Sequence, residues 1–145
     1  MTKLILASKS PRRLQLLNST NIIPDIVDPP NINESIIQEE KPKIYLKRIC
    51  LEKAKSIQKK YENDIILAAD TIVSTKQKIF LKPKNEKDAK KTLKYLSGRN
   101  HSVITGVCVL FKDRKKVKII ETKIKFKKLH NNEIDQYIKT SQWVD

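Results

Sequence analysis

The segment LILASKSPRRLQLL near the N-terminus gathers hydroxyls and cations at the point where an apolar strand is expected to lead into a helix. Its hydroxyls and charges come from Ser8, Lys9, Ser10, Arg12 and Arg13. A helix N-terminus presents unpaired backbone N–H groups and the positive end of the helix dipole, so anions bind there readily. Two arginines are unfavourable at that end unless an anion offsets their charge. The segment therefore fits either a polyphosphate site or an ordinary capped helix with solvated arginines.

Asp70 interrupts the strongly apolar segment IILAADTIV. An ionised carboxylate inside a hydrophobic strand costs free energy unless it is paired, hydrogen-bonded or bound to a metal. In such a strand Asp70 could hold a divalent cation or accept a proton from a water molecule. The alternative is structural, with the strand ending at Ala69 and Asp70 beginning a turn.

Lys53 lies on the face of a predicted helix that is expected to point inward. When that helix is projected at about 100° per residue, Lys53 shares one stripe with Leu46, Cys50 and Ile57. An ammonium group in the middle of an apolar stripe is either directed into a site or carried to solvent by its flexible stem. The spacing alone leaves both interpretations open.

The predicted loops supply two further candidates, Lys82 and Glu34. Lys82 precedes a capped helix, where it could contact a phosphate or be one of many surface lysines. Glu34 follows the second predicted strand and could supply a metal ligand. The two histidines, His101 and His130, have no cysteine or histidine partners at ligand spacing, so a zinc site is not expected.

The elements that would position these residues alternate between strands and helices. Strands are expected over residues 3–7, 22–27, 64–74, 77–80, 101–111 and 116–129. Helices are expected to begin at Pro11, after a Ser10 cap, at Pro42 and at Asn85, and over residues 131–140. The last two strands flank the polar turn KDRKK and should form a hairpin. Alternation followed by a hairpin predicts an α/β fold with a mixed sheet.

The composition narrows the class of protein. The chain has 145 residues and a formal net charge of +15, with only five arginines among its 31 basic residues. Scattered lysines and few aromatics favour incidental charge over a dedicated nucleic-acid surface, although a basic nucleic-acid-binding module stays open. No apolar run reaches the roughly 20 residues that span a bilayer, so no membrane partner is expected. The two separated cysteines and the basic N-terminus indicate reduced, buried thiols in a cytoplasmic protein.

These motifs resemble, in order, those of the Maf (septum-formation-inhibitor-like) family of nucleoside triphosphate pyrophosphatases. LASKSPRRLQLL resembles the N-terminal signature of that family, and AADTIV resembles its central aspartate motif. LKPKNEKDAKKTLKYLSGRNHSVITGV and ETKIKFKKLHNNEIDQYI are similar to the segments that follow. The resemblance implies an ITPase-like α/β fold, in which a mixed sheet is flanked by helices. It also implies cleavage of a triphosphate between its α- and β-phosphates with a divalent cation, magnesium or manganese.

The resemblance further implies a role for each matching residue. Asp70 would accept the proton of the attacking water, and Glu34 and Asp70 would hold the metal. The triphosphate would be surrounded by Ser8, Ser10, Arg12, Arg13, Lys53 and Lys82. Thr71 and Arg12 point to the branch that acts on dTTP and UTP, with modified pyrimidine nucleotides as further substrates. The implied partner is therefore a nucleoside triphosphate, and no specific nucleic acid is expected.

The resemblance is incomplete at the C-terminal end. Family members continue beyond the equivalent of QWVD into further strands and a helix, whereas the sequence stops there. A single Maf-like domain over residues 1–145, incomplete at its C-terminus, is therefore expected. It should expose strand edges and apolar surface, which a homodimer could cover. The alternative function is that of an inactive remnant that binds nucleotides or polyanions without turnover.

Overall fold

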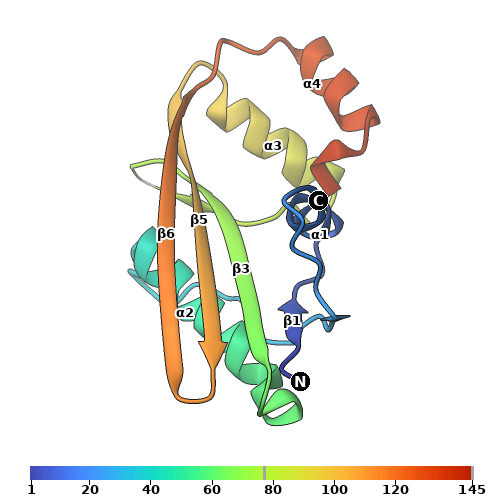
Figure 1. Ribbon diagram of the computed structural model, residues 1–145. Coiled ribbons are helices and arrows are strands. Elements are labelled where there is room, and N and C mark those ends of the chain that lie inside the picture. Colours follow the sequence, from blue (N-terminus) through green and yellow to red (C-terminus); the bar gives the residue numbers. More distant parts are fainter. Residues whose placement is uncertain (77, 145) are drawn as a thin grey trace. The chain divides into compact units, whose positions relative to one another are not determined.

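The computed structural model describes residues 1–76 and 78–144 of the chain (Figure 1). Contacts between residues divide it into two compact units. The first unit comprises Met1–Thr71 and Thr105–Ile120, and the second comprises residues 72–104 and 121–144. The single domain expected over the whole chain stays a prediction.

The sheet has the strand order β2-β1-β3-β5-β6, with β4 paired to β3 off that path. Its strands are β1 (Leu4–Ala7), β2 (Ile26–Val27), β3 (Ile65–Ser74), β4 (Ile79–Phe80), β5 (Asn100–Phe111) and β6 (Arg114–Lys125). Strand β1 runs parallel to both β2 and β3, whereas β4 runs antiparallel to β3. The predicted mixed sheet is therefore confirmed.

The helices follow the predicted signals closely. They are α1 (Pro11–Ser19), α2 (Pro42–Gln58), α3 (Glu86–Leu96) and α4 (Asn131–Lys139), with 3₁₀ turns η1 (Lys59–Tyr61) and η2 (Gln142–Val144). Pro11 and Pro42 each occupy the first turn, where the missing proline N–H costs no hydrogen bond. Among the described residues, no helix is both long and apolar enough to cross a membrane.

The second strand is much shorter than predicted. The sequence favours a strand over residues 22–27, but β2 contains only Ile26–Val27. Ile22 is still tied to the end of α1, because its N–H donates to the Leu17 carbonyl at 3.0 Å, and pairing with β1 starts only at Asp25, whose N–H donates to the Leu4 carbonyl at 2.9 Å. Asn21 has φ 63°, in the left-handed region that commonly closes a helix. The predicted start was therefore wrong, since the helix end takes up the first part of the apolar run.

The predicted hairpin is present, and its turn is tighter than expected. Residues 112–116 were predicted to form the turn, but β5 and β6 are joined by Lys112 and Asp113 alone. Lys112 has φ 54°, which lets the chain reverse within two residues. The short strand predicted over residues 77–80 is only partly represented by β4, and Gln77 lies outside the described residues.

In the first unit, α2 packs on one face of the sheet. The cluster that joins them contains Ile5, Ala7, Cys50, Ala54, Ile66, Ala68, Cys108 and Leu110. A Cβ atom on Gly106 would lie 2.9 Å from the Cys50 sulfur, so only glycine lets the helix approach this closely. Cys50 and Cys108 are buried free thiols, as predicted, and burial raises the pKa of Cys50 to about 12.

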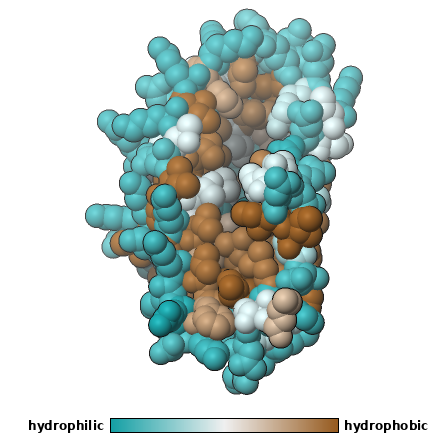
Figure 2. All heavy atoms as spheres, viewed as in Figure 1, coloured by the Kyte–Doolittle hydropathy of each residue, from teal (hydrophilic) through white to brown (hydrophobic). Residues whose placement is uncertain are grey.

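The opposite face of the sheet in the first unit is partly open. Gly106 and Cys108 face α2, so strand alternation places Val107 and Val109 on the other face. Val109 on β5 is 39% exposed and Ile120 on β6 is 50% exposed. Figure 2 shows hydrophobic residues gathered on the face in view, with hydrophilic residues around its margins. The expected exposed apolar surface is therefore present.

In the second unit, α3 and α4 pack against each other through a small apolar cluster. Its buried members are Ala89, Ile134 and Ile138, with Leu93, Leu129 and Trp143 packed beside them. The Trp143 indole N–H donates to the Ile138 carbonyl at 3.0 Å, which ties η2 to the end of α4. His101 packs edge-on against Phe126 at a centroid distance of 4.6 Å.

Candidate active site

The candidate site lies in the first unit, where β1 ends and its parallel pairing with β3 stops. Strands β1 and β3 pair with Ala7 opposite Ala68. Ser8 follows β1 and is 5% exposed, and Ala69 and Asp70 follow in β3. In α/β sheets, ligands bind at the carboxyl ends of parallel strands. The topology therefore places Ser8 and Asp70 at the edge of the sheet where a ligand is expected.

The start of α1 is arranged around Ser8, Ser10 and Arg13. The Ser10 hydroxyl caps the helix by accepting the Arg13 N–H at 3.3 Å, and the Ser10 N–H donates to the Ser8 hydroxyl at 3.1 Å. The Arg13 guanidinium donates through Nη1 to the Ser8 hydroxyl at 3.0 Å and to the Ala69 carbonyl at 3.2 Å. Arg13 thereby joins the helix start to both strands. The first turn of α1 contains no acidic residue, so its dipole and charges favour an anion.

Asp70 and Lys53 face each other inside the first unit. Strand β3 continues through Asp70 to Ser74, so the alternative in which Asp70 begins a turn is wrong. Lys53 on α2 is 12% exposed, and its Nζ lies 3.6 Å from Asp70 Oδ1 and 2.8 Å from Glu34 Oε1. The ammonium group is therefore directed inward between two carboxylates, and it does not reach solvent along its stem.

The surroundings of Asp70 shift its titration. Burial raises the pKa of the Asp70 carboxyl, and the Lys53 charge and the Thr71 N–H oppose that shift. A carboxylate with a raised pKa is a better proton acceptor near neutral pH than an exposed one. The environment of Asp70 therefore suits a general base.

Glu34 and Asp70 also provide the donor set for a divalent cation. Their carboxylates contact the same ammonium group, and both are oxygen donors. Among the described residues, no group of three or more His, Cys, Asp or Glu side chains converges on a metal position. Magnesium typically binds through one or two carboxylates together with substrate phosphates and water. The two carboxylates fit that pattern.

Three of the predicted site residues come from the exposed start of α1, the other face of β3 and the second unit. Arg12 lies in the first turn of α1 and is exposed. Thr71 follows Asp70 in β3, so alternation directs it to the opposite face, where its hydroxyl lies 3.0 Å from the Thr105 hydroxyl. Lys82 belongs to the second unit, between β4 and α3. The roles of these three residues in binding stay predictions.

Two residues near this site were not predicted. Tyr45 and Arg48 on α2 hold the loop that carries Glu34. The sequence could have singled out Arg48, since it is one of only five arginines in a chain where lysine supplies most of the positive charge. A retained arginine indicates a need for its planar, forked donor geometry.

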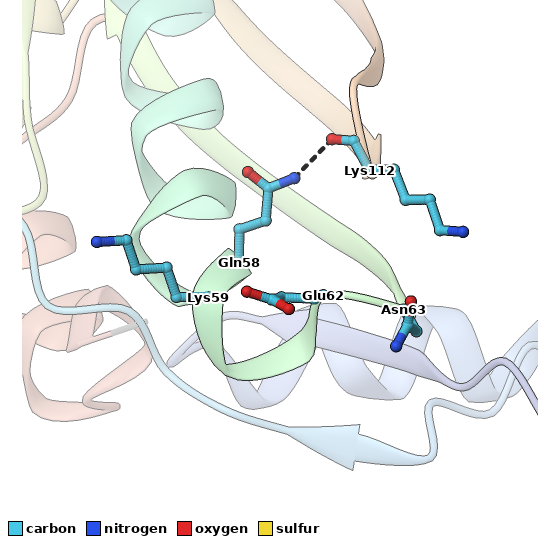
Figure 3. Close-up of a pocket in the computed structure, with 5 residues that line it drawn as sticks. All are labelled: Gln58, Lys59, Glu62, Asn63 and Lys112. Atoms are coloured by element: carbon cyan, nitrogen blue, oxygen red, sulfur yellow. Dashed lines mark hydrogen bonds between the residues drawn. The ribbon is translucent and has the colours of Figure 1, made fainter.

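A hollow at the far end of α2 contains none of the predicted residues (Figure 3). It has a volume of about 330 Å³ and is lined by Gln58, Lys59, Glu62, Asn63 and Lys112. The Gln58 amide donates to the Lys112 carbonyl at 2.6 Å, which ties the helix end to the hairpin turn. This hollow is therefore part of the scaffold and separate from the candidate site.

A cation-rich helix start beside a partly buried aspartate, where β1 ends and its parallel pairing with β3 stops, is the arrangement expected of an α/β protein that binds phosphate groups. The model of the family described as "Maf-like protein" matches residues 3–145. The chain therefore belongs to the Maf-like family, and the predicted Maf-like fold is confirmed.

Curated relatives agree with this assignment. The chain is 43% identical over 141 residues to a dTTP/UTP pyrophosphatase of Caulobacter vibrioides, covering 97% of this chain and 73% of the relative. It is 44% identical over 149 residues to a dTTP/UTP pyrophosphatase of Pyrococcus furiosus, covering 100% of this chain and 75% of the relative. Protein VC0702 from Vibrio cholerae has a similar fold, with a TM-score of 0.50, 9% identity, and coverage of 99% of this chain and 72% of that one.

Proposed function

We propose that this chain is a nucleoside triphosphate pyrophosphatase that hydrolyses dTTP and UTP to the monophosphate and pyrophosphate. Family membership and the names of its relatives support the reaction and the substrate class. The observation that carries the proposal is the position of Asp70, partly buried beside Lys53 and one residue after the carbonyl that Arg13 binds. A cytoplasmic location and a homodimer stay predictions.

In this proposal the start of α1 binds the phosphates. Arg12, Arg13, the two serine hydroxyls and the backbone N–H groups neutralise the charge of the triphosphate. Arg13 is already oriented by its bonds to Ser8 and Ala69, so little conformational entropy is lost on binding. The leaving pyrophosphate therefore gains its stabilisation from groups fixed before the substrate arrives.

Asp70 acts as the proton acceptor. A water oxygen attacks the α-phosphorus, the bond from that phosphorus to the bridging oxygen breaks, and pyrophosphate leaves with the bridging oxygen. The proton of the water passes to the Asp70 carboxylate, whose raised pKa suits this task. Lys53 holds Asp70 in place, and its charge opposes the rise in the pKa of the Asp70 carboxyl.

Glu34 and Asp70 would hold the divalent cation, magnesium or manganese. When bound there, such an ion supplies positive charge that stabilises the phosphate oxygens in the transition state. Lys53 contacts the same two carboxylates, so it balances their charge when the cation is absent.

The proposal is tested by measuring pyrophosphate release from purified protein with dTTP, UTP, CTP and methylated GTP in the presence of magnesium or manganese. We expect turnover with dTTP and UTP and little with methylated GTP. Protein that is folded by circular dichroism but turns over none of the four nucleotides would contradict the enzymatic function. Stabilisation by nucleotide without any turnover would identify a binding remnant instead.

A further inference from the structure

The loop that carries Glu34 has little regular structure of its own. It connects β2 to α2, and the Glu34 side chain is 50% exposed. An exposed loop samples many conformations, and ordering it costs conformational entropy. Glu34 nevertheless lies 2.8 Å from the Lys53 ammonium group. Contacts elsewhere in the loop must therefore supply its order.

Tyr45 provides the first of these contacts. Its side chain is 1% exposed in the first turns of α2, and its hydroxyl donates to the Glu34 carbonyl at 2.7 Å. A buried tyrosine hydroxyl keeps a hydrogen-bond partner because an unsatisfied one is costly. The bond fixes the backbone of the residue whose carboxylate faces Lys53.

Arg48, one turn further along α2, provides the second contact. Its guanidinium pairs with both oxygens of Glu40, at 2.7 Å from Nε and 2.8 Å from Nη2. The same Nη2 donates to the Ser35 carbonyl at 3.0 Å. A bidentate arginine–carboxylate pair has a defined geometry that lysine cannot reproduce. Arg48 therefore holds the loop at two points, one of them adjacent to Glu34.

Glu40 in turn stabilises the loop through its own hydrogen bonds to Ile37. Its Oε1 accepts the Ile37 N–H at 3.2 Å, and its own N–H donates to the Ile37 carbonyl at 2.9 Å. The Glu40 side chain is only 7% exposed. The hydrogen bonds from Arg48 to Ser35 and Glu40 therefore connect the segment to α2 at two points.

From these contacts we infer that Tyr45 and Arg48 are positioning residues, which hold the loop over residues 33–40 on α2 so that the Glu34 carboxylate meets Lys53 beside Asp70. This inference rests on the proposed function for the role of Glu34 toward a divalent cation. Neither residue touches the phosphates or the reacting atoms in this account. They act through the placement of Glu34.

Amide hydrogen exchange of the loop tests the positioning directly, whether or not the chain turns over nucleotide. Tyr45→Phe removes only the hydroxyl, and Arg48→Lys keeps the charge but loses the fork. We expect exchange over residues 33–40 to accelerate about tenfold in Tyr45→Phe and more in Arg48→Lys, because each loses hydrogen bonds to the loop. Exchange in α4 should stay at the parent value, which excludes global unfolding as the cause.

Turnover supplies a second measurement that general destabilisation would not reproduce. With dTTP, we expect the magnesium concentration for half-maximal rate to rise about tenfold in both variants, while KM for dTTP changes little. Glu52→Gln is the matched control, because Glu52 contacts Arg48 at 3.3 Å on the exposed side and does not contact the loop in this network. It should leave exchange and magnesium dependence unchanged.

The outcomes separate the two proposals. Parent-like exchange over residues 33–40 in both variants would overturn the positioning role, whatever their turnover. Faster exchange with an unchanged magnesium dependence would overturn the link from the loop to the metal. A parent protein without turnover would contradict the proposed function, and hydrogen exchange would still decide whether Tyr45 and Arg48 hold Glu34 in place.

Discussion

Two helices of this protein, α1 in the first unit and α3 in the second, begin with the same type of cap and opposite charges. In α1 the Ser10 hydroxyl accepts the N–H of Arg13 at 3.3 Å. In α3 the side-chain oxygen Oδ1 of Asn85 accepts the N–H of Asp88 at 2.9 Å. In both helices the cap reaches the third helical residue, so the local hydrogen bonding is equivalent. The difference lies in the charges of the side chains in the first turn.

The side-chain charges in the first turn of α3 interact favourably with the helix dipole, whereas those in the first turn of α1 interact unfavourably with it. Glu86 and Asp88 place negative charge at the positive end of α3. The first turn of α1 holds Arg12 and Arg13 and has no acid. An unfavourable charge arrangement next to the partly buried Asp70 favours the binding of an anion. The cap alone therefore does not distinguish the two helix starts, and the charges of the first turn do.

The largest expected difference between the two helix starts is in catalysis. Arg13→Ala removes the contacts to Ser8 and Ala69 and one cation from the phosphate site. We expect kcat/KM for dTTP to fall about 10²–10³-fold, as for the loss of other electrostatic contacts in active sites. Lys87→Ala removes a cation from the first turn of α3 and should leave kcat/KM within about twofold. Equal losses in the two variants would mean that total charge matters and its place does not.

The two glycines extend the comparison to packing. Gly106→Ala places a Cβ atom 2.9 Å from the Cys50 sulfur and 3.3 Å from the Leu46 Cβ, so α2 must shift. We expect a loss of about 1–3 kcal/mol in the free energy of unfolding, measured in urea, together with reduced turnover. Gly98→Ala, where φ is +69° and the nearest atom lies 3.9 Å away, should cost about 1 kcal/mol through backbone strain alone. Parent-like stability of Gly106→Ala would refute the close approach of α2.

The smallest expected difference between the two helix starts is in the stability that each cap contributes. Ser10→Ala and Asn85→Ala each remove one hydrogen bond to a helix N–H group. Each should lower the free energy of unfolding by about 1 kcal/mol in urea titrations. Only Ser10→Ala should also weaken turnover of dTTP, because Ser10 belongs to the proposed phosphate site. If Asn85→Ala reduced turnover to the same degree, the functional distinction between the helix starts would fail.

The features predicted correctly are those whose signals are local in the sequence. Ser10 before Pro11 and Asn85 before Glu86 predicted two helix starts, because a cap and its partner lie three residues apart. The boundary at Ile26 was missed, since the left-handed residue Asn21 extends the end of α1 into an apolar run typical of a strand.

The same distinction between local and long-range signals applies to the residues of the candidate site. Asp70 and Lys53 could be predicted because a charge inside an apolar pattern is visible in one segment. The contacts of Tyr45 and Arg48 could not be predicted, because the loop they hold has no periodicity and the contacts span 8 to 13 residues of sequence. The orientation of Thr71 toward Thr105 depends on pairing between distant strands. Long-range contacts of this kind follow from the fold and leave no local pattern.

Replacement of Asp70 tests the central claim most directly. Asp70→Asn keeps the shape of the side chain and removes its capacity to accept a proton, whereas Asp88→Asn makes the same change at the start of α3. Pyrophosphate release from dTTP, measured side by side at saturating nucleotide, should fall about 10³-fold in Asp70→Asn and stay near the parent rate in Asp88→Asn. Release by Asp70→Asn at the parent rate would contradict the account.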